Sequence, residues 1–488
     1  MSQRVYGRWE RPRSAGLFGL TWGVSMLGMA LVVAVMVGFM VTRSILVAGA
    51  LIVAGTVIFV PLVITRNGRT GWETLLLRSQ FVLARRRGEH IYRAGRFSMI
   101  PGTSRLPGLL ADSTMVEYET PGGRRFGMIH IRRTDHYTVV LRVRPRGKEL
   151  VDQAQIDDWV TGYGQFLATQ GRDEIVAVTA VLEHVVETRL QQRREVARLV
   201  RPQAPEFART VMTEAGASGG SGVRIEARIA LTYRPLGHAK THRDRAEQAK
   251  EIGQRLQGVL AHLNNAGLPA TPMTAAEVLG MVRSRYDLAA QADVEEAGED
   301  ILATQGWDAA GPISHLDSWD HFVHDGGRSV TWEMDAAPRG TVLETGMEEL
   351  LRPRPDVPRK RVAIVYRLHS AGDAAKMVDS DYRDALAAEQ TERGIASAAA
   401  SIRVANTQAS RQEQARGAGL TRFGMLITVS DRLDADLPGI EASVTAMTAA
   451  SRLGVRRCYG YQASAFAASL GIGLVLPEHG SISRRMSA

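Results

Sequence analysis

Two long uncharged apolar runs at the N-terminus constrain this chain more than any other feature. Residues 14–42 contain no charged side chain, Arg43 interrupts, and residues 44–65 are uncharged again. Each run exceeds the ~20 residues that a helix needs to cross a hydrocarbon core of ~30 Å. A signal peptide would hold one short run and a cleavage site, and a soluble helical pair would show a polar stripe. The sequence therefore predicts a tail and a transmembrane helical hairpin over residues 1–66.

Arginine side chains flank the predicted hairpin on its outer ends. The N-terminal tail holds four arginines, the loop between the runs holds only Arg43, and a further group follows the second run. Basic flanks stay on the cytoplasmic side of a membrane. We therefore expect a multi-pass protein of the plasma (inner) membrane whose N-terminus and C-terminal domain are both cytoplasmic. The single cysteine, Cys458, agrees, because it can form no internal disulfide.

Residues 67–110 form a basic juxtamembrane segment. Between Trp72 and Arg87 apolar side chains recur at helical spacing, and the stretch ends in three consecutive arginines. This pattern fits an interfacial helix on the cytoplasmic leaflet, and equally a continuation of the second membrane helix into the cytoplasm. Arginines beside a bilayer attract anionic headgroups by roughly 1 kcal/mol each. We expect contact with membrane lipid at Arg66, Arg69, Trp72, Arg78, Arg85, Arg86 and Arg87.

The positive charge of the chain is concentrated in this N-terminal part. The formal net charge is +9, yet residues 1–110 contain 14 arginines and 3 glutamates, a balance of +11, so the remaining residues sum to −2. A domain that binds nucleic acid needs a basic face of its own. The distribution therefore argues against a direct nucleic-acid partner.

The rest of the chain is long enough for two domains, which we expect over residues 111–290 and 291–488. Patterns rich in Val, Ile and Tyr predict strands at 114–119, 125–131, 136–143, 175–185, 223–233, 329–334, 360–368, 421–429 and 455–461. Helical spacing predicts helices at 151–170, 187–200, 205–215, 241–267, 274–286, 371–418 and 437–453. The helix over 371–418 is either continuous or broken near Arg393 and Gly394. This order favours an α+β fold with cytoplasmic, ferredoxin-like α/β sandwich domains.

Two short echoes raise the alternative of an internal duplication. The tetrapeptide RFGM at 125–128 recurs at 422–425, and RIALTYRPL at 228–236 is similar to RVAIVYRL at 361–368. Matches of this length also arise by chance, so duplicated and unrelated domains both stay open.

Motifs of known catalytic chemistry are missing, so we predict no catalytic residue, no cofactor and no metal. The sequence has no phosphate-binding loop, nucleophile elbow, H-E-x-x-H or C-x-x-C motif. The densest group of possible ligands is His315, Asp317, Asp320, His321, His324 and Asp325. His321 and His324 could share a helix face and bind a metal, but we favour a small packed helix inside a polar connection. A D-A-D triplet at 434–436 lies in a polar loop rather than after a buried strand.

Three passages, at 324–353, 361–381 and 459–478, resemble the N-terminal, non-ATPase part of VirB-type conjugative ATPases. They begin HDGGRSVTWEMD, RVAIVYRLHSAG and YGYQASAFAASL. The layout as a whole resembles EccE, the two-helix membrane component of actinobacterial type VII secretion. It is most similar to actinobacterial integral membrane proteins that accompany conjugation-type ATPases, with GEHIYRAG at 88–95 after the hairpin as the most typical stretch. The nucleotide-binding half of the conjugative ATPases is absent from this sequence.

This resemblance implies a non-catalytic membrane component of a type VII or type IV (conjugation) secretion machine. Such a component would dock a separate ATPase and sister membrane subunits, and would act within an oligomer or hetero-complex. The alternative from the residues is a membrane-bound glycosyltransferase-like enzyme, for which Asp434 and Asp436 have the spacing of a metal-binding Asp-x-Asp.

Overall fold

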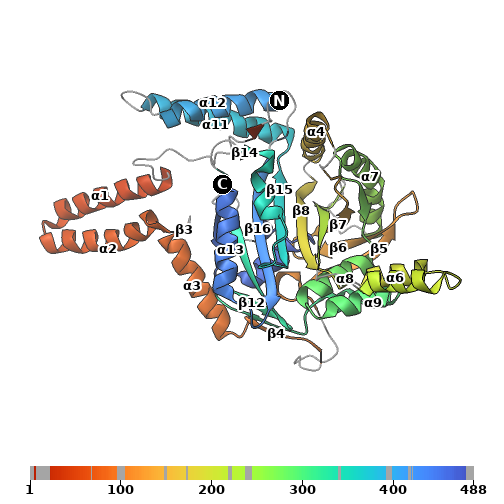
Figure 1. Cartoon of the computed structure of the whole chain (residues 1–488). Helices are drawn as coiled ribbons and strands as arrows, with labels where there is room; N and C mark the ends of the chain where they lie inside the picture. The colour runs from red at the N-terminus through yellow and green to blue at the C-terminus, as the bar shows by residue number, and fades with distance from the viewer. Residues whose placement is uncertain are drawn as a thin grey trace.

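The computed structural model describes residues 5–6, 22–66, 69–95, 105–147, 151–171, 174–188, 190–217, 222–236, 245–338, 342–391, 398–415, 419 and 421–479. Figure 1 shows two long helices projecting from a body that is built on one large sheet. The α+β fold class predicted from the sequence is thereby confirmed, whereas a ferredoxin-like assignment of the separate halves stays a prediction.

The projecting helices are α1 (Trp22–Thr42) and α2 (Ile45–Val63). By length and composition both could cross a membrane, and only 6% of each apolar window is buried in the structure. Small residues lie where the two helices meet, since a Cβ at Gly38 would stand 2.5 Å from the Leu51 side chain. Their outer surfaces are apolar and exposed, which sets them apart from the core helices of a soluble domain.

A 13-stranded antiparallel sheet runs through the body in the order β4-β11-β12-β13-β16-β15-β8-β9-β7-β6-β5. Two further strands join it beside this path, β10 next to β7 and β17 next to β13. The strands are β4 (Ile91–Arg93), β5 (Ser113–Glu119), β6 (Arg125–Ile131), β7 (His136–Val143), β8 (Ile175–Val186), β9 (Val223–Tyr233), β10 (Ala270–Pro272), β11 (Ser314–Asp317), β12 (Phe322–His324), β13 (Gly327–Ala336), β15 (Lys360–Leu368), β16 (Thr421–Arg432) and β17 (Gly454–Arg457).

The helices of the body fill the connections between these strands. They are α3 (Gly71–Arg86), α4 (Gln153–Thr169), α5 (Leu190–Leu199), α6 (Glu206–Ala217), α7 (Arg245–Asn265), α8 (Ala275–Tyr286), α9 (Ala290–Ala303), α10 (Glu348–Leu351), α11 (Ala371–Thr391), α12 (Ala398–Ala415), α13 (Leu437–Ala450) and α14 (Gln462–Ser469). Outside the main sheet, β1 (Val5–Tyr6) pairs with β14 (Val342–Leu343), and β2 (Thr65–Arg66) pairs with β3 (Arg69–Thr70).

The two halves of the body repeat one topology. Outward from the central pair of β8 and β15, the first half runs β8-β9-β7-β6-β5 and the second runs β15-β16-β13-β12-β11. In each half a helical hairpin joins the first two of these strands, a helix and a short strand follow, and a final helix ends the unit. The sequence echoes do not follow this repeat. RFGM falls on β6 and β16, and the longer echo on β9 and β15, which are not equivalent strands.

Alternating side chains place hydrophobic cores on both faces of the sheet. In β6, Phe126 and Met128 join a core with α4 and α7, whereas Ile129 and Ile131 join a core on the opposite face with α8 and α14. The core under α8 and α14 is continuous across both halves, while the other face carries a separate core under α13. Segments from both sides of residue 290 thus share one sheet and one core. The boundaries at residues 66, 110 and 290 stay a prediction.

The predicted strands and helices agree with most of these elements. The expected helix over 371–418 is described as α11 and α12, and the position of the expected break, near Arg393 and Gly394, lies outside the described residues. One expectation is wrong. The expected small helix within 315–325 is a β-hairpin of β11 and β12, in which His315 and His324 are register partners. Its aromatic and aliphatic side chains fit alternation as well as helical spacing, and pairing with β4 and β13 decides between them.

Candidate functional site

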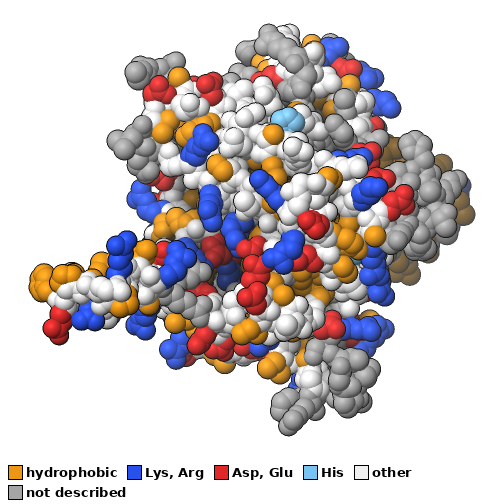
Figure 2. Space-filling view, turned by 90° about the vertical axis from the view of Figure 1, so that its right-hand side faces the viewer, with side chains coloured by type: hydrophobic (Ala, Val, Ile, Leu, Met, Phe, Trp, Pro, Cys, Tyr) orange, Lys and Arg blue, Asp and Glu red, His pale blue; other side chains and the backbone are white. Residues whose placement is uncertain are grey.

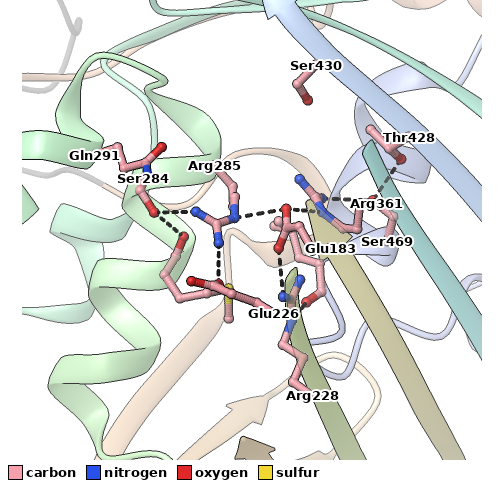
Figure 3. A network of polar contacts seen from close by, with 12 residues as sticks. Glu183, Glu226, Arg228, Ser284, Arg285, Gln291, Arg361, Thr428, Ser430 and Ser469 are labelled. Atoms are coloured by element: carbon pink, nitrogen blue, oxygen red, sulfur yellow. Dashed lines mark hydrogen bonds and ion pairs between the residues drawn. The ribbon is translucent and has the colours of Figure 1, made fainter. Parts of the chain in front are cut away.

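A buried carboxylate in the middle of the sheet holds three arginines. Glu183 of β8 accepts hydrogen bonds from Arg228 of β9 at 2.7 Å and from Arg361 of β15 at 2.8 Å, and it forms an ion pair with Arg285 of α8 at 2.9 Å. The side chains of all four residues are at most 8% exposed. Glu183 and Arg361 are direct cross-strand partners, so their side chains point to the same face of the sheet. Figure 3 shows the guanidinium groups converging on this carboxylate.

The charges of this network control its protonation. Burial by itself raises the pKa of Glu183, but Arg285, Arg361 and Arg228 together hold that pKa well below its usual range. Arg285 also donates to Glu226 at 2.7 Å, and Glu226 in turn binds Arg224. The central carboxylate is therefore ionised, and it shares its negative charge among several cations.

Contacts of the same arginines with the end of α14 join the two halves. Arg361 donates to Ser469 Oγ at 2.9 Å, and its guanidinium lies 5.0 Å from the centre of the Phe466 ring. Arg228 donates from Nε to the Leu470 carbonyl at 3.0 Å. The network thus connects strands of the first half with the final helix of the second.

A pocket opens beside this network, with about 300 Å³ of empty space that includes its open side. Strands β8, β15 and β16 and helices α8 and α9 supply its wall, together with Arg359 and Leu288 next to these elements. The charged wall residues are Glu183, Arg285, Arg359, Lys360 and Arg361. Polar wall residues include Thr428 and Ser430, of which Figure 3 shows Ser430 across the space from Arg285. The wall offers more cationic than anionic groups.

Sequence reasoning missed this site, although a signal for it is present. Glu183, Arg228 and Arg361 are charged residues within strands that are rich in Val, Ile, Leu and Ala. A charge inside such a strand must find a partner, because an unpaired buried charge is costly. That argument marks the three residues as a group, but the sequence does not reveal that they meet.

The juxtamembrane segment packs against the body through its basic and aromatic side chains. Arg69 pairs with Glu333 of β13 at 3.0 Å and donates to the Tyr461 hydroxyl at 2.6 Å. On α3, the Phe81 ring meets the Trp319 ring edge-on at 5.3 Å, and Arg78 lies 5.9 Å from the centre of Trp319. Strand β4 then extends the main sheet by pairing with β11. The segment is part of the fold of the body.

The opposite face of α3 is apolar and exposed. Leu75, Leu76, Val82 and Leu83 are each about half exposed, and their spacing of one and seven residues places them on one side of the helix. A capping box of Thr70 and Glu73 begins the helix. An exposed apolar stripe opposite a docked face fits the interfacial helix better than a continued membrane helix, because Figure 1 shows α3 turning away from the line of α2.

The seven residues expected at the membrane surface fall into three groups. Arg69 and Arg78 contact the body, and Trp72 donates from its indole to the Ile58 carbonyl of α2 at 2.8 Å. Arg85, Arg86 and Arg87 are exposed at the end of α3. The side chain of Arg66 lies outside the described residues. Lipid contact by these side chains stays a prediction.

The histidine and aspartate motifs do not converge. His324 is buried, with Nδ1 2.5 Å from the Tyr286 carbonyl and Nε2 2.7 Å from Ser329 Oγ. His321 lies beside Asp320 at 2.8 Å. In the part of the chain that the structure describes, no group of three or more His, Cys, Asp or Glu side chains could hold a metal. Asp434 is exposed and pairs with Arg432 at 3.4 Å, on a surface turn before α13.

Comparison with known proteins adds one partial match. Residues 13–73 match a family model described as a domain of unknown function, DUF8461. No curated protein matches the chain. The matched stretch covers α1 and α2, the two helices that could cross a membrane, and the beginning of α3.

Proposed function

We propose that this chain is a non-catalytic, membrane-anchored adaptor of a bacterial secretion or conjugation machine, of the type VII (EccE-like) or type IV kind. Its hairpin crosses the plasma membrane twice, with the N-terminus and the body in the cytoplasm. There the body docks a separate ATPase and sister membrane subunits within a hetero-complex. The resemblance in sequence to EccE and to conjugation-associated membrane proteins suggests these partners.

One observation carries the proposal: the anchor is built into the body. Strand β4 belongs to the main sheet, and Arg69 joins the beginning of the juxtamembrane segment to Glu333 and Tyr461. A tethered enzyme needs only a flexible linker between anchor and domain. A body held at a set orientation above the bilayer instead suits a platform on which other subunits assemble.

A surface for such a subunit lies at the far end of the body. Helices α5 and α6 form a hairpin on the side away from α1 and α2 (Figure 1), and Figure 2 shows it projecting with hydrophobic side chains at its free end. Phe207 is 80% exposed and Val211, one helical turn on, is 44% exposed. An apolar helix face at this distance from the anchor is available to a cytoplasmic protein.

Two experiments test this proposal. A reporter that is active only outside the cytoplasm, fused after Ala488, should be silent, and activity would refute the orientation. For docking, Phe207→Arg should reduce co-purification of the full-length chain with its ATPase at least tenfold. Ile402→Arg, which changes a side chain that is 58% exposed on α12, is the matched control. Equal loss in both variants, or loss in neither, would refute docking at α6.

A further inference from the structure

The pocket beside Glu183 has more positive charge than its own carboxylate neutralises. Arg285 and Arg361 share Glu183, and Arg285 also uses Glu226. Arg359 lines the same pocket, yet its side chain makes no hydrogen bond or ion pair with any described residue, and its buried Nε has no acceptor. Burial lowers the pKa of Arg359, the charge of Asp431 raises it and that of Arg285 lowers it further. An anion in the pocket would give this guanidinium the acceptor that its buried Nε lacks.

We propose that this pocket binds a phosphate group, held by Arg359 together with Arg285 and Arg361. Guanidinium groups are planar forks whose paired N–H donors match two oxygens of a phosphate, which makes arginine the usual residue for this task. The Lys360 ammonium is bound elsewhere, to the Arg352 carbonyl at 2.9 Å. The three guanidiniums of the wall therefore meet two carboxylates, Glu183 and Glu226, and the remaining positive charge favours an anion. The inference does not depend on the adaptor role.

The Ser430 hydroxyl at the pocket wall can accept a hydrogen bond from a protonated phosphate oxygen. The Tyr286 carbonyl can only accept, so His324 donates to it from Nδ1 and accepts at Nε2 from the Ser329 hydroxyl. Ser329 then accepts from Ser430, whose Oγ lies 2.6 Å away. Ser430 is left with lone pairs rather than a proton for a ligand in the pocket. Hydrogen phosphate can donate its remaining proton there, whereas sulfate has none at neutral pH.

The position of the pocket gives binding a structural consequence. Arg285 belongs to α8 of the first half, and Arg359 and Arg361 belong to the second half at the beginning of β15. A phosphate between them would contact both halves at the central strand pair of β8 and β15. Binding would therefore stabilise the whole body against unfolding rather than one half.

The test uses the full-length chain purified in detergent. Inorganic phosphate should bind saturably in calorimetric titration at constant ionic strength, and should raise the unfolding temperature by several degrees at ~100-fold excess over its Kd. Sulfate should bind at least tenfold more weakly. AMP and ADP form a second arm, because tighter binding than inorganic phosphate would identify a nucleotide as the source of the phosphate group.

Arg359→Gln is the decisive variant, because it removes a cation whose side chain makes no hydrogen bond or ion pair with the described residues of the Glu183 network. It should bind phosphate at least tenfold more weakly, and without phosphate it should unfold at the same temperature as the wild type or higher. Arg432→Gln, an exposed change in the neighbouring strand, should bind like the wild type. The proposal is overturned if the wild type shows no saturable binding, if Arg359→Gln binds phosphate equally well, or if sulfate binds as tightly.

Discussion

Replacing Glu183 by glutamine should bring the body close to unfolding. The change keeps the shape of the side chain but leaves Arg228 and Arg361 without the only carboxylate that pairs with them among the described residues. Arg285 retains Glu226. Breaking one buried ion pair by removing a partner costs about 3–5 kcal/mol. Because two guanidinium groups would lack a carboxylate partner, we expect the unfolding free energy to fall by at least that amount from a total of about 5–15 kcal/mol.

Urea unfolding of the full-length protein in detergent, followed by near-UV circular dichroism, would measure this loss. Glu195→Gln is the matched control, since Glu195 and Arg198 form an exposed pair on α5 that contributes about 0–1 kcal/mol. Adding Arg361→Gln to Glu183→Gln should recover part of the loss, giving a coupling of about 0.5–3 kcal/mol. If Glu183→Gln proves as stable as Glu195→Gln, the network is not what holds the halves together.

The acid sensitivity of this network has a definite sign. The folded-state pKa of Glu183 lies well below the ordinary value of 4.5, so folding favours the ionised carboxylate. Its stabilisation is fully present above pH 4.5 and declines as the pH falls through the lower folded-state value. The difference in unfolding free energy between the wild type and Glu183→Gln should therefore be constant from pH 5 to 7 and shrink only in stronger acid.

Three further outcomes are expected. Burial lowers the pKa of His324 from 6.5 to about 4. Because the unfolded chain then binds the proton more tightly than the folded one, the unfolding free energy should fall by up to about 3 kcal/mol between pH 6.5 and 4. In His324→Gln the slope of unfolding free energy against pH should flatten. Gly473→Ala should cost about 3 kcal/mol or more in urea unfolding, because φ is +94° and the new Cβ would lie 2.0 Å from Thr138 Oγ1; stability equal to the wild type would contradict the close contact. Arg69→Ala should increase protease cleavage next to Thr70 while Arg87→Ala should not, since Arg69 is 16% and Arg87 63% exposed. Equal cleavage of both variants would show that Arg69 does not hold the beginning of α3 to the body.

Local patterns in the sequence were enough to predict most of the elements. Charge-free runs of sufficient length specify α1 and α2 whatever surrounds them. Period-two alternation and a capping box at Thr274 and Glu277 locate β6, β7 and α8 within a residue or two. These signals depend on neighbours along the chain, so they are readable without knowing the fold.

The hairpin of β11 and β12 is an element that local sequence patterns do not predict correctly. The spacing of Leu316, Trp319, Phe322 and Val323 fits a short helix, and the same stretch also fits two short strands. The stretch forms strands because β4 and β13 pair with it on either side, and β4 comes from a segment far away in the sequence. The same holds for Arg69 and Arg78, whose basic character indicated a membrane surface and whose partners Glu333 and Trp319 only the fold supplies.

The central site was decided entirely by tertiary structure. The four central charged residues of the network, Glu183, Arg228, Arg285 and Arg361, lie on four different elements and are separated by 45 residues or more. Composition and spacing indicate that a charge within a buried strand needs a partner, but they do not indicate which residue that partner is. The antiparallel pairing of β8 with β15 brings the two halves together at Glu183 and Arg361. A carboxylate and its cations become a site only when long-range pairing removes them from water together.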